Sequence, residues 1–427
     1  MAEVVVTMVT GNEYIFDNID QALEYVLEME QKTLAADIYR SKPPIIIRPD
    51  LGMHPIPVDS LDYPLGAWFN NEADDKFVMT RLMSGRYSLK PNLSNRKILF
   101  RGESEFHNPC KPNLFRNNKK RFTAELARGQ EMMLLMLSHP LVQLLDLGVE
   151  LCGEVYRFEM NLFGLTQHYY NKTSLIDLTS DPMVAAFFAT AKHDDKTDTY
   201  SPIVDENHEP GVLYYYNLDI NTDFGKPAGT KQSPLSTIGL QVFPRSGKQK
   251  GFLYDMRPTE NFNEVAQLNA VRFHHDPAIS RRICAHFHDG KDLFPDDILM
   301  KQWKNVGWNS KTLSSRTVKM NHLFNPKMTL AEVDAEIRSL GFDIKDYIPS
   351  FTNEELEEYY DAVKKKNFWD DFCNQIHIPG DKLGNMMKEL LDLPNNPKYR
   401  WAFERDDNHV TDYNQGFVLK KYKTCLI

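Results

Sequence analysis

Short apolar runs separated by polar segments recur through the middle of the chain. Residues 97–102, 174–178 and 211–218 each have the length and composition of a β-strand, and another apolar strand follows a polar turn near Gly251. The run at 211–218 is apolar enough for the interior of a sheet. The pattern therefore predicts a sheet with buried central strands.

Helical spacing flanks these strands on both sides. An N-terminal helix is expected after Asp17 or Asn18, with its apolar side chains on one side. A second helical region covers 120–148 and is expected to break near His139-Pro140, and a further helix is expected at 150–163.

The stretch that begins at Gln167 joins a polar turn to a strand and then to a helix. Thr179, Ser180 or Asp181 can cap the helix, Pro182 suits its first turn, and the apolar residues that follow predict burial. A strand that brings hydroxyls and a carboxylate to a helix start suits an anionic or phosphorylated ligand. The plainer alternative is a well-capped helix without a ligand.

Three regions are expected along the chain. Residues 1–95 hold the first helix and a proline-rich part, 40–95, that is expected to be irregular and loop-rich. Residues 96–290 form the core, and residues 291–427 are mainly helical, with helices at 330–340, 353–366 and 382–393. The fold class is therefore predicted to be α+β, with a mixed or antiparallel central β-core and helices.

Composition narrows the choice of partners. The chain has 427 residues, of which 42% are hydrophobic and 26% charged, as in a folded soluble protein. The net charge of -9 makes long nucleic acid an unfavourable partner. The five cysteines are odd in number and lack CxxC spacing, and no apolar run is long enough to cross a membrane. A cytoplasmic protein that does not bind membranes is expected.

A metal site is the weaker alternative among the candidate sites. His286 and His288 alternate as strand ligands would, and His274 or Asp276 could complete a set. Histidines near a basic pair such as Arg281-Arg282 more often lie on a polar face, and we expect no metal.

Three separated blocks carry a resemblance to a known family. The first is Phe100-Arg101-Gly102-Glu103, and the second is Gln167-His168-Tyr169 followed by the strand with Asp177 and Thr179. The third is Arg245-x-x-x-Gln249-x-Gly251. In this order the blocks resemble the FRG-domain family. The chain departs from the family pattern at Tyr170, Asn171, Lys172, Ser174 and Leu178, and so resembles a divergent member.

More distantly, the order of the blocks resembles the plan of ADP-ribosyltransferases. That resemblance implies a split sheet of the ADP-ribosyltransferase type, with NAD as the substrate. It assigns catalysis to His168, Asp177 and Gln249, and NAD binding to Arg101, Gly102, Tyr169, Thr179, Ser180 and Arg245. Gln249 stands where the transferase plan has a carboxylate, and an amide cannot act as a base.

Each of these residues also has a structural alternative. Arg101 could form a buried ion pair with Asp177, and His168 could be a satisfied core histidine. Thr179 and Ser180 could be plain helix caps. Gln249 and Arg245 could stabilise a turn.

Two classes of function follow. The first is an NAD-handling enzyme that transfers ADP-ribose to a macromolecule or hydrolyses NAD, as a toxin or defence effector would. Its partners would be a nucleotide and a macromolecular acceptor. The alternative is a non-catalytic nucleotide-binding, nucleic-acid-binding or protein-interaction module.

Overall fold

The computed structural model divides the chain into two compact units. It describes residues 9–405 apart from 37–45, 48–54, 57–59, 64, 83, 117–121, 195–196, 220–222, 224–232, 304–309, 366 and 382. The first unit comprises Met1–Pro112 and Ser174–Pro295, and the second comprises Asn113–Thr173 and Asp296–Ile427. Residues 113–173 therefore group with the C-terminal part of the chain.

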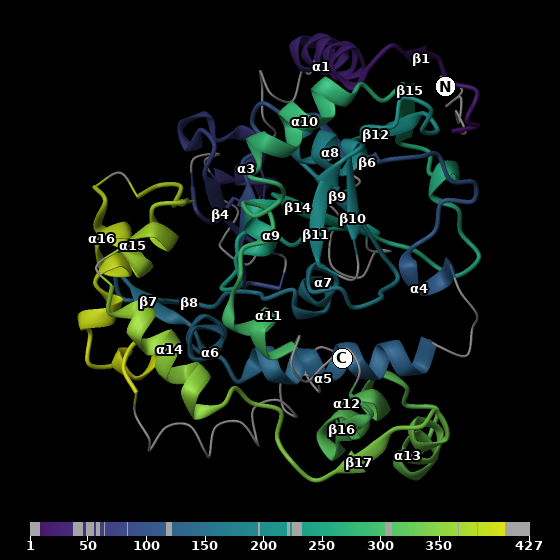
Figure 1. The fold of residues 1–427 in the computed structure, drawn as a ribbon. Helices are drawn as coiled ribbons and strands as arrows, with labels where there is room; N and C mark the ends of the chain where they lie inside the picture. Colours follow the sequence, from purple (N-terminus) through teal and green to yellow (C-terminus); the bar gives the residue numbers. More distant parts are fainter. Residues whose placement is uncertain are drawn as a thin grey trace. The chain divides into compact units, whose positions relative to one another are not determined.

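A mixed seven-stranded sheet forms the centre of the first unit (Figure 1). Its strands, in spatial order, are β1 (Ile15–Phe16), β15 (Leu268–Phe273), β12 (Gly211–Asn217), β6 (Ile98–Glu103), β9 (Leu175–Thr179), β14 (Gly251–Asp255) and β13 (Leu235–Thr237). Among the described residues of this sheet, β1 and β15 pair in parallel and the other pairs are antiparallel. The predicted strands are thus confirmed as neighbours at the centre of the sheet, and the α+β class is confirmed.

Three helices cover one face of this sheet: α1 (Ile19–Ala36), α8 (Pro182–Thr190) and α10 (Pro277–His286) (Figure 1). Phe100 and Phe273 point from the strands into this layer, where they meet Phe187 of α8. The opposite face has its own core, in which Leu99 packs with Tyr214 and other buried side chains. Both faces of the central strands are therefore buried, as their continuous apolar runs predict.

Helix α8 begins as its sequence predicts. Asp181 caps it by accepting a hydrogen bond from the backbone N–H of Met183 at 2.9 Å, and Pro182 occupies the first turn.

A buried carboxylate ties α1 to the start of β6. Glu30 is 0% exposed and accepts hydrogen bonds from Arg96 Nη1 at 2.9 Å and from the backbone amides of Lys97 and Ile98 at 2.6 and 3.0 Å. These bonds fix the point at which β6 enters the sheet.

The proline-rich part holds more regular structure than its sequence predicts. Its elements are β2 (Ile46–Ile47), β3 (Pro55–Ile56), α3 (Gly66–Phe69), β4 (Phe77–Arg81) and β5 (Tyr87–Pro91). Strands β4 and β5 pair as a hairpin, and Trp68 of α3 is buried in the core beneath the sheet. The prolines shorten the elements without preventing them.

The remaining elements of the first unit are short. A hairpin of β10 (Ala191–Asp194) and β11 (Thr199–Pro202) follows α8, and α9 (Arg245–Lys248) precedes β14.

The second unit begins with α4 (Asn113–Arg116), α5 (Phe122–Leu137) and α6 (Pro140–Leu147). The break between α5 and α6 at His139-Pro140 is confirmed. The helix predicted at 150–163 is wrong, because β7 (Val149–Leu151) and β8 (Glu154–Tyr156) form a hairpin there and α7 (Leu162–His168) starts later. Cys152 and Gly153 have φ angles of 51° and 83°, a turn conformation that ends a helix.

The C-terminal part of this unit is mainly helical. Its elements are α11 (Ile298–Gln302), β16 (Thr312–Ser314), α12 (Ser315–Phe324), α13 (Leu330–Ser339), β17 (Asp343–Lys345), α14 (Asn353–Val363), α15 (Phe368–Cys373), β18 (Ile376–His377) and α16 (Asn385–Leu391). Glu131 of α5 accepts hydrogen bonds from the Ser314 backbone and the Thr317 hydroxyl, and so joins the two segments of the unit. Among the described residues, no helix combines the length and apolar character that a membrane crossing requires.

Candidate functional site

The first and third blocks and the strand of the second meet on adjacent strands of the first unit. In the register of the sheet, Thr179 of β9 pairs with Phe100 of β6 on one side and with Gly251 of β14 on the other. Segments far apart in the sequence are thereby placed side by side, as the central strands in Figure 1 show.

Arg101 and Glu103 form an ion pair on this central strand. Arg101 donates from Nε to Oε1 of Glu103 at 3.0 Å, and Nη2 reaches the same oxygen. Nη1 donates to the carbonyl oxygen of Asp177 at 3.0 Å. The side chains are 17% and 9% exposed. The guanidinium is therefore held in one orientation by two strands.

The surroundings of Arg101 favour its charged form. Burial works against the charged guanidinium, but Glu103, Cys110 and Asp177 raise the pKa of Arg101 above its ordinary value. Tyr214 of β12 lies beside Arg101 in the register. Burial, with Cys110 and Glu103, raises the pKa of the Tyr214 phenol, so this group stays protonated.

The hydrogen bond between Asp177 and Arg101 is made by the backbone carbonyl of Asp177. Side chains alternate along β9, and Ile176 and Leu178 point into the core that lies on the Arg101 side of the sheet. The Asp177 side chain therefore points to the face that α8 covers. The ion pair of Arg101 is made with Glu103 instead of the Asp177 carboxylate.

Gly102 has a packing role in the structure. A Cβ at this position would overlap the carbonyl oxygen of Ala185 and lie 2.8 Å from the backbone nitrogen of Ala189. Glycine is what lets α8 pack directly on β6.

Thr179 and Ser180 lie where β9 turns into α8. The Thr179 hydroxyl donates to the carbonyl oxygen of Gln249 at 2.7 Å and accepts from the backbone N–H of Asp181 at 3.0 Å. Thr179 thus ties the second block to the third, while Asp181 is the residue that caps the helix.

A small charged cavity of about 50 Å³ lies next to Ser180. Lys250 crosses it and contacts Asp75 at 2.6 Å and Asp181 at 3.2 Å. The complete lining is Asp75, Phe77, Pro91, Asn92, Arg96, Ser180, Asp181 and Lys250. Since Lys250 pairs with Asp75 and Asp181, and Arg96 pairs with Glu30, the cavity suits water better than a free ion.

The third block is buried and holds a distant segment. Gln249 donates from Nε2 to the carbonyl oxygen of Leu293 at 3.1 Å. Arg245 is 1% exposed, and its guanidinium lies 5.5 Å from the centre of the Phe294 ring. Neither side chain lies on the surface.

The Gln-His-Tyr block belongs to the second unit. His168 ends α7 and is buried, and the buried Tyr169 donates its hydroxyl hydrogen to Asp297. Thr173 donates to the side-chain oxygen of Gln167. The structure thus brings Arg101, Gly102, Asp177, Thr179, Ser180, Arg245 and Gln249 together in one unit and places His168 and Tyr169 in the other.

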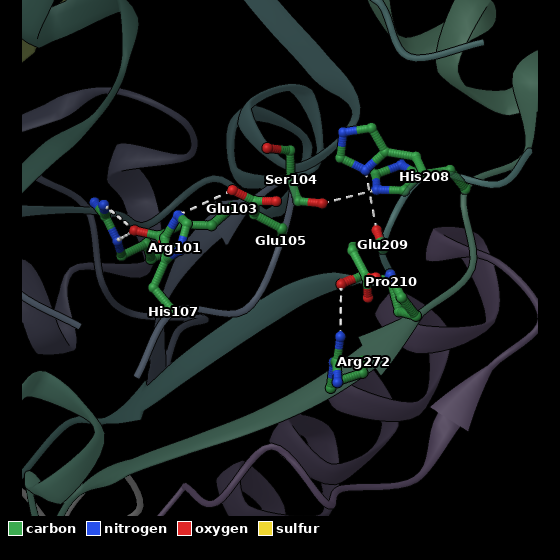
Figure 2. Close-up of polar contacts among 10 residues, drawn as sticks. Arg101, Glu103, Ser104, Glu105, His107, His208, Glu209, Pro210 and Arg272 are labelled. Atoms are coloured by element: carbon green, nitrogen blue, oxygen red, sulfur yellow. Dashed lines mark hydrogen bonds and ion pairs between the residues drawn. The ribbon is translucent and has the colours of Figure 1, made fainter. Parts of the chain in front are cut away.

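Sequence reasoning did not select Glu103 as a site residue. The signal was present, because Arg101 and Glu103 are two positions apart on a predicted strand and must share a face. Further polar contacts lie beyond Glu103 at this end of the sheet. His275 Nε2 lies 2.9 Å from the carbonyl oxygen of Ser104. Arg272 donates a hydrogen bond to the carbonyl oxygen of Pro210 at 2.9 Å. Figure 2 shows this end of the sheet with Arg101, Glu103 and Arg272 labelled.

His288 and Asp276, both weighed as metal ligands, have other contacts. Nδ1 of His288 lies 2.7 Å from an oxygen of Asp292, and the side chain of Asp276 caps α10. Burial lowers the pKa of His275. Within the described ranges, no three or more histidine, cysteine or acidic side chains stand together as a metal site.

Comparison with known proteins gives one match. No curated protein and no solved structure matches the chain. Residues 96–198 match the model of the FRG domain, and this segment contains β6, β9 and α8. The segment 96–198 is therefore assigned to the FRG-domain family.

Proposed function

We propose that the sheet of the first unit binds NAD and that the protein is an NAD-handling enzyme, which transfers ADP-ribose to a macromolecule or hydrolyses NAD. The observation that carries this proposal is the meeting of the FRG blocks at Thr179, between Phe100 and Gly251, on strands next to the Arg101–Glu103 pair. The pair places a shielded guanidinium next to these blocks, where it can attract an anionic ligand.

Arg101 supplies the phosphate-binding group in this proposal. A guanidinium is a planar fork that can donate two hydrogen bonds to a pyrophosphate. The Asp177 carbonyl and Glu103 hold this fork in place before a ligand arrives. Because Arg101 is largely shielded from water, its attraction to a phosphate is stronger than at an open surface.

The proposal includes a cytoplasmic location, where NAD is available. The described cysteines Cys110, Cys152, Cys284 and Cys373 are free thiols, which suits a reducing compartment.

The test is NAD turnover by the purified full-length protein with a cell lysate as a source of acceptors. Nicotinamide release and transfer of labelled ADP-ribose are measured for the wild type, Arg101→Ala and Arg101→Lys. Arg101→Lys keeps a cation beside Glu103 but removes the fork. Both variants are expected to lose activity by about 100-fold or more.

Arg282→Ala is the matched control, because Arg282 is an exposed arginine of the same unit that pairs with Asp20. It is expected to retain activity. Absence of both nicotinamide release and label transfer in the wild type would overturn the enzymatic proposal.

One observation favours a second candidate, a nucleotide-binding module without catalysis. Gln249 stands where the transferase plan has an acid, and its amide is engaged with the Leu293 carbonyl. This candidate is supported if ADP-ribose binds the wild type and not Arg101→Ala while NAD stays intact over hours.

A further inference from the structure

We infer that Glu103 supplies the carboxylate that stabilises the reacting ribose, in the role that Gln249 cannot take. This inference rests on the proposed NAD chemistry and names the residue that would perform it. It also identifies the ligand class as a nucleotide with a pyrophosphate next to a ribose that has free hydroxyls.

Glu103 is placed by the strand that also places Arg101. The two side chains are two positions apart on β6 and therefore point to the same face. The register puts Tyr214 beside Arg101 and Val212 beside Glu103. The Glu103 carboxylate therefore lies next to the Arg101 guanidinium on this face. The two groups are close enough to contact the ribose and the pyrophosphate of one ligand.

Cleavage of a bond to the anomeric carbon needs a carboxylate for a physical reason. The transition state resembles an oxocarbenium ion, so positive charge develops on the ribose. A carboxylate that accepts a hydrogen bond from the 2-hydroxyl stabilises this charge more than it stabilises the ground state. An amide carries no charge and cannot provide the same stabilisation.

Other acids near the blocks fit this role less well. The Asp177 side chain points to the α8 side of the sheet, and its hydrogen bond with Arg101 is made by the backbone carbonyl. Glu105 is 46% exposed and lies 3.6 Å from His107 at the surface. Glu103 is the acid in contact with Arg101, at 9% exposure.

The ligand would exchange partners with the ion pair. A pyrophosphate takes over the Arg101 fork, and the ribose hydroxyls then donate to the Glu103 carboxylate that Arg101 has released. Arg272 stands on the same face, across Val212 from Glu103, and adds a second positive charge. A ligand that has phosphate but no ribose would break the Arg101–Glu103 ion pair and leave Glu103 without a new hydrogen-bond donor. Such a ligand is expected to bind more weakly than one with both groups.

The reaction is balanced as follows. The bond between the ribose anomeric carbon and the nicotinamide ring nitrogen breaks, and its electron pair neutralises the pyridinium. A bond forms from that carbon to the oxygen of water or of an acceptor group, whose proton is released to solvent. Glu103 transfers no proton in this step, because its role is to stabilise the charge on the ribose.

The experiment compares Glu103→Gln with the wild type in NAD turnover and in the affinity for ADP-ribose. Turnover is expected to fall by about 100-fold or more. ADP-ribose affinity is expected to change by about tenfold or less, because Arg101 still binds the pyrophosphate. Pyrophosphate alone is expected to bind the wild type more weakly than ADP-ribose.

Glu105→Gln is the matched control, because it makes the same chemical change two residues away at the surface. It is expected to behave as the wild type. If circular dichroism shows that Glu103→Gln does not fold, Glu103→Asp replaces it. The aspartate side chain keeps the carboxylate but is shorter by one methylene group. Glu103→Asp is then expected to lose turnover at least tenfold with ADP-ribose binding retained.

The outcomes separate this inference from the function on which it rests. A wild-type protein that neither releases nicotinamide nor transfers label overturns the proposed enzyme itself. An active wild type with a fully active Glu103→Gln, or one in which Asp177→Asn alone abolishes turnover, overturns the assignment of Glu103 and leaves NAD chemistry standing.

Discussion

Gln249 donates its side-chain N–H to the carbonyl oxygen of Leu293, 44 residues further along the chain, at 3.1 Å. Next to it, the Arg245 guanidinium lies against the ring of Phe294. The third block, which lies outside the matched segment 96–198, therefore holds the last residues of the first unit in place, and both side chains are buried.

Replacing Gln249 with glutamate is expected to destabilise the first unit. The carboxylate cannot donate to Leu293, and it would place a negative charge against a carbonyl oxygen in a buried position. We expect a loss of about 1–3 kcal/mol in the free energy of unfolding. Urea denaturation measures the loss, and Gln31→Glu on the exposed side of α1 is the control. An unchanged urea midpoint for Gln249→Glu would contradict a stabilising role for the Gln249–Leu293 hydrogen bond.

Gly102→Ala is expected to weaken the packing of α8 on β6. The added methyl group would overlap the Ala185 carbonyl oxygen, which is backbone and cannot rotate away. Overpacking of this kind costs typically about 1–3 kcal/mol, and more where the backbone must move. Thermal unfolding measures the effect. Gly247→Ala provides the comparison, because the nearest contact of its methyl group would be the flexible end of Leu240 at 3.0 Å, so its melting temperature is expected to fall less.

His139 is expected to make the second unit sensitive to acid. Burial lowers the pKa of His139 from 6.5 to about 3, and its Nδ1 accepts a hydrogen bond from the Leu141 amide. The unfolded chain takes up a proton below pH 6.5 while the folded chain does not, so stability is lost as pH falls from 6.5 towards 3. The loss is about 1.4 kcal/mol per pH unit, or roughly 2 kcal/mol at pH 5.

Hydrogen exchange of the α6 peptides between pH 7 and pH 5 measures this dependence once corrected for intrinsic exchange rates. His139→Asn keeps a capping acceptor for α6 and removes the titrating ring, so its stability is expected to depend less on pH. If stability depends on pH equally in the wild type and in His139→Asn, the His139 ring does not cause the pH dependence.

Glu30→Ala is expected to be among the most destabilising changes in α1. It leaves the Arg96 guanidinium and the amides of Lys97 and Ile98 without their buried acceptor. Removing one partner from such a pair costs about 3–5 kcal/mol. Glu28→Ala removes an exposed glutamate of the same helix that pairs with Lys32, and it is expected to cost under about 1 kcal/mol. Chemical denaturation of the two variants in parallel tests the difference.

The strands that the sequence predicts correctly share one property. Residues of β6, β9, β12 and β14 form short, mainly apolar runs, because the apolar positions on both faces of these strands are buried. Strand β15 has no such run, since Asn269 and Arg272 interrupt it, and its place beside β12 becomes visible only in the sheet.

The hairpin at β7 and β8 illustrates a limit of local patterns. The apolar spacing around Val149, Leu151 and Tyr156 fits a helix as well as a hairpin over so few residues. The turn at Cys152-Gly153 decides between them, and a positive φ at a cysteine has no strong sequence signal.

The candidate site was predictable in its elements and less so in its contacts. Alternation on β6 was enough to place Glu103 beside Arg101. The engagement of Gln249 with Leu293 depends on how distant segments pack, and no local pattern reports it.

The division of the chain at Pro112, Thr173 and Pro295 has a consequence for dissecting the protein by proteolysis. The chain passes between the two units three times, so a single cut releases neither of them. A protease that cleaves only after Pro295 would leave the second unit as two separate polypeptides, joined by contacts such as those of Glu131 with Ser314 and Thr317. The FRG segment at 96–198 itself enters both units, and it cannot be cut out as an intact piece of either.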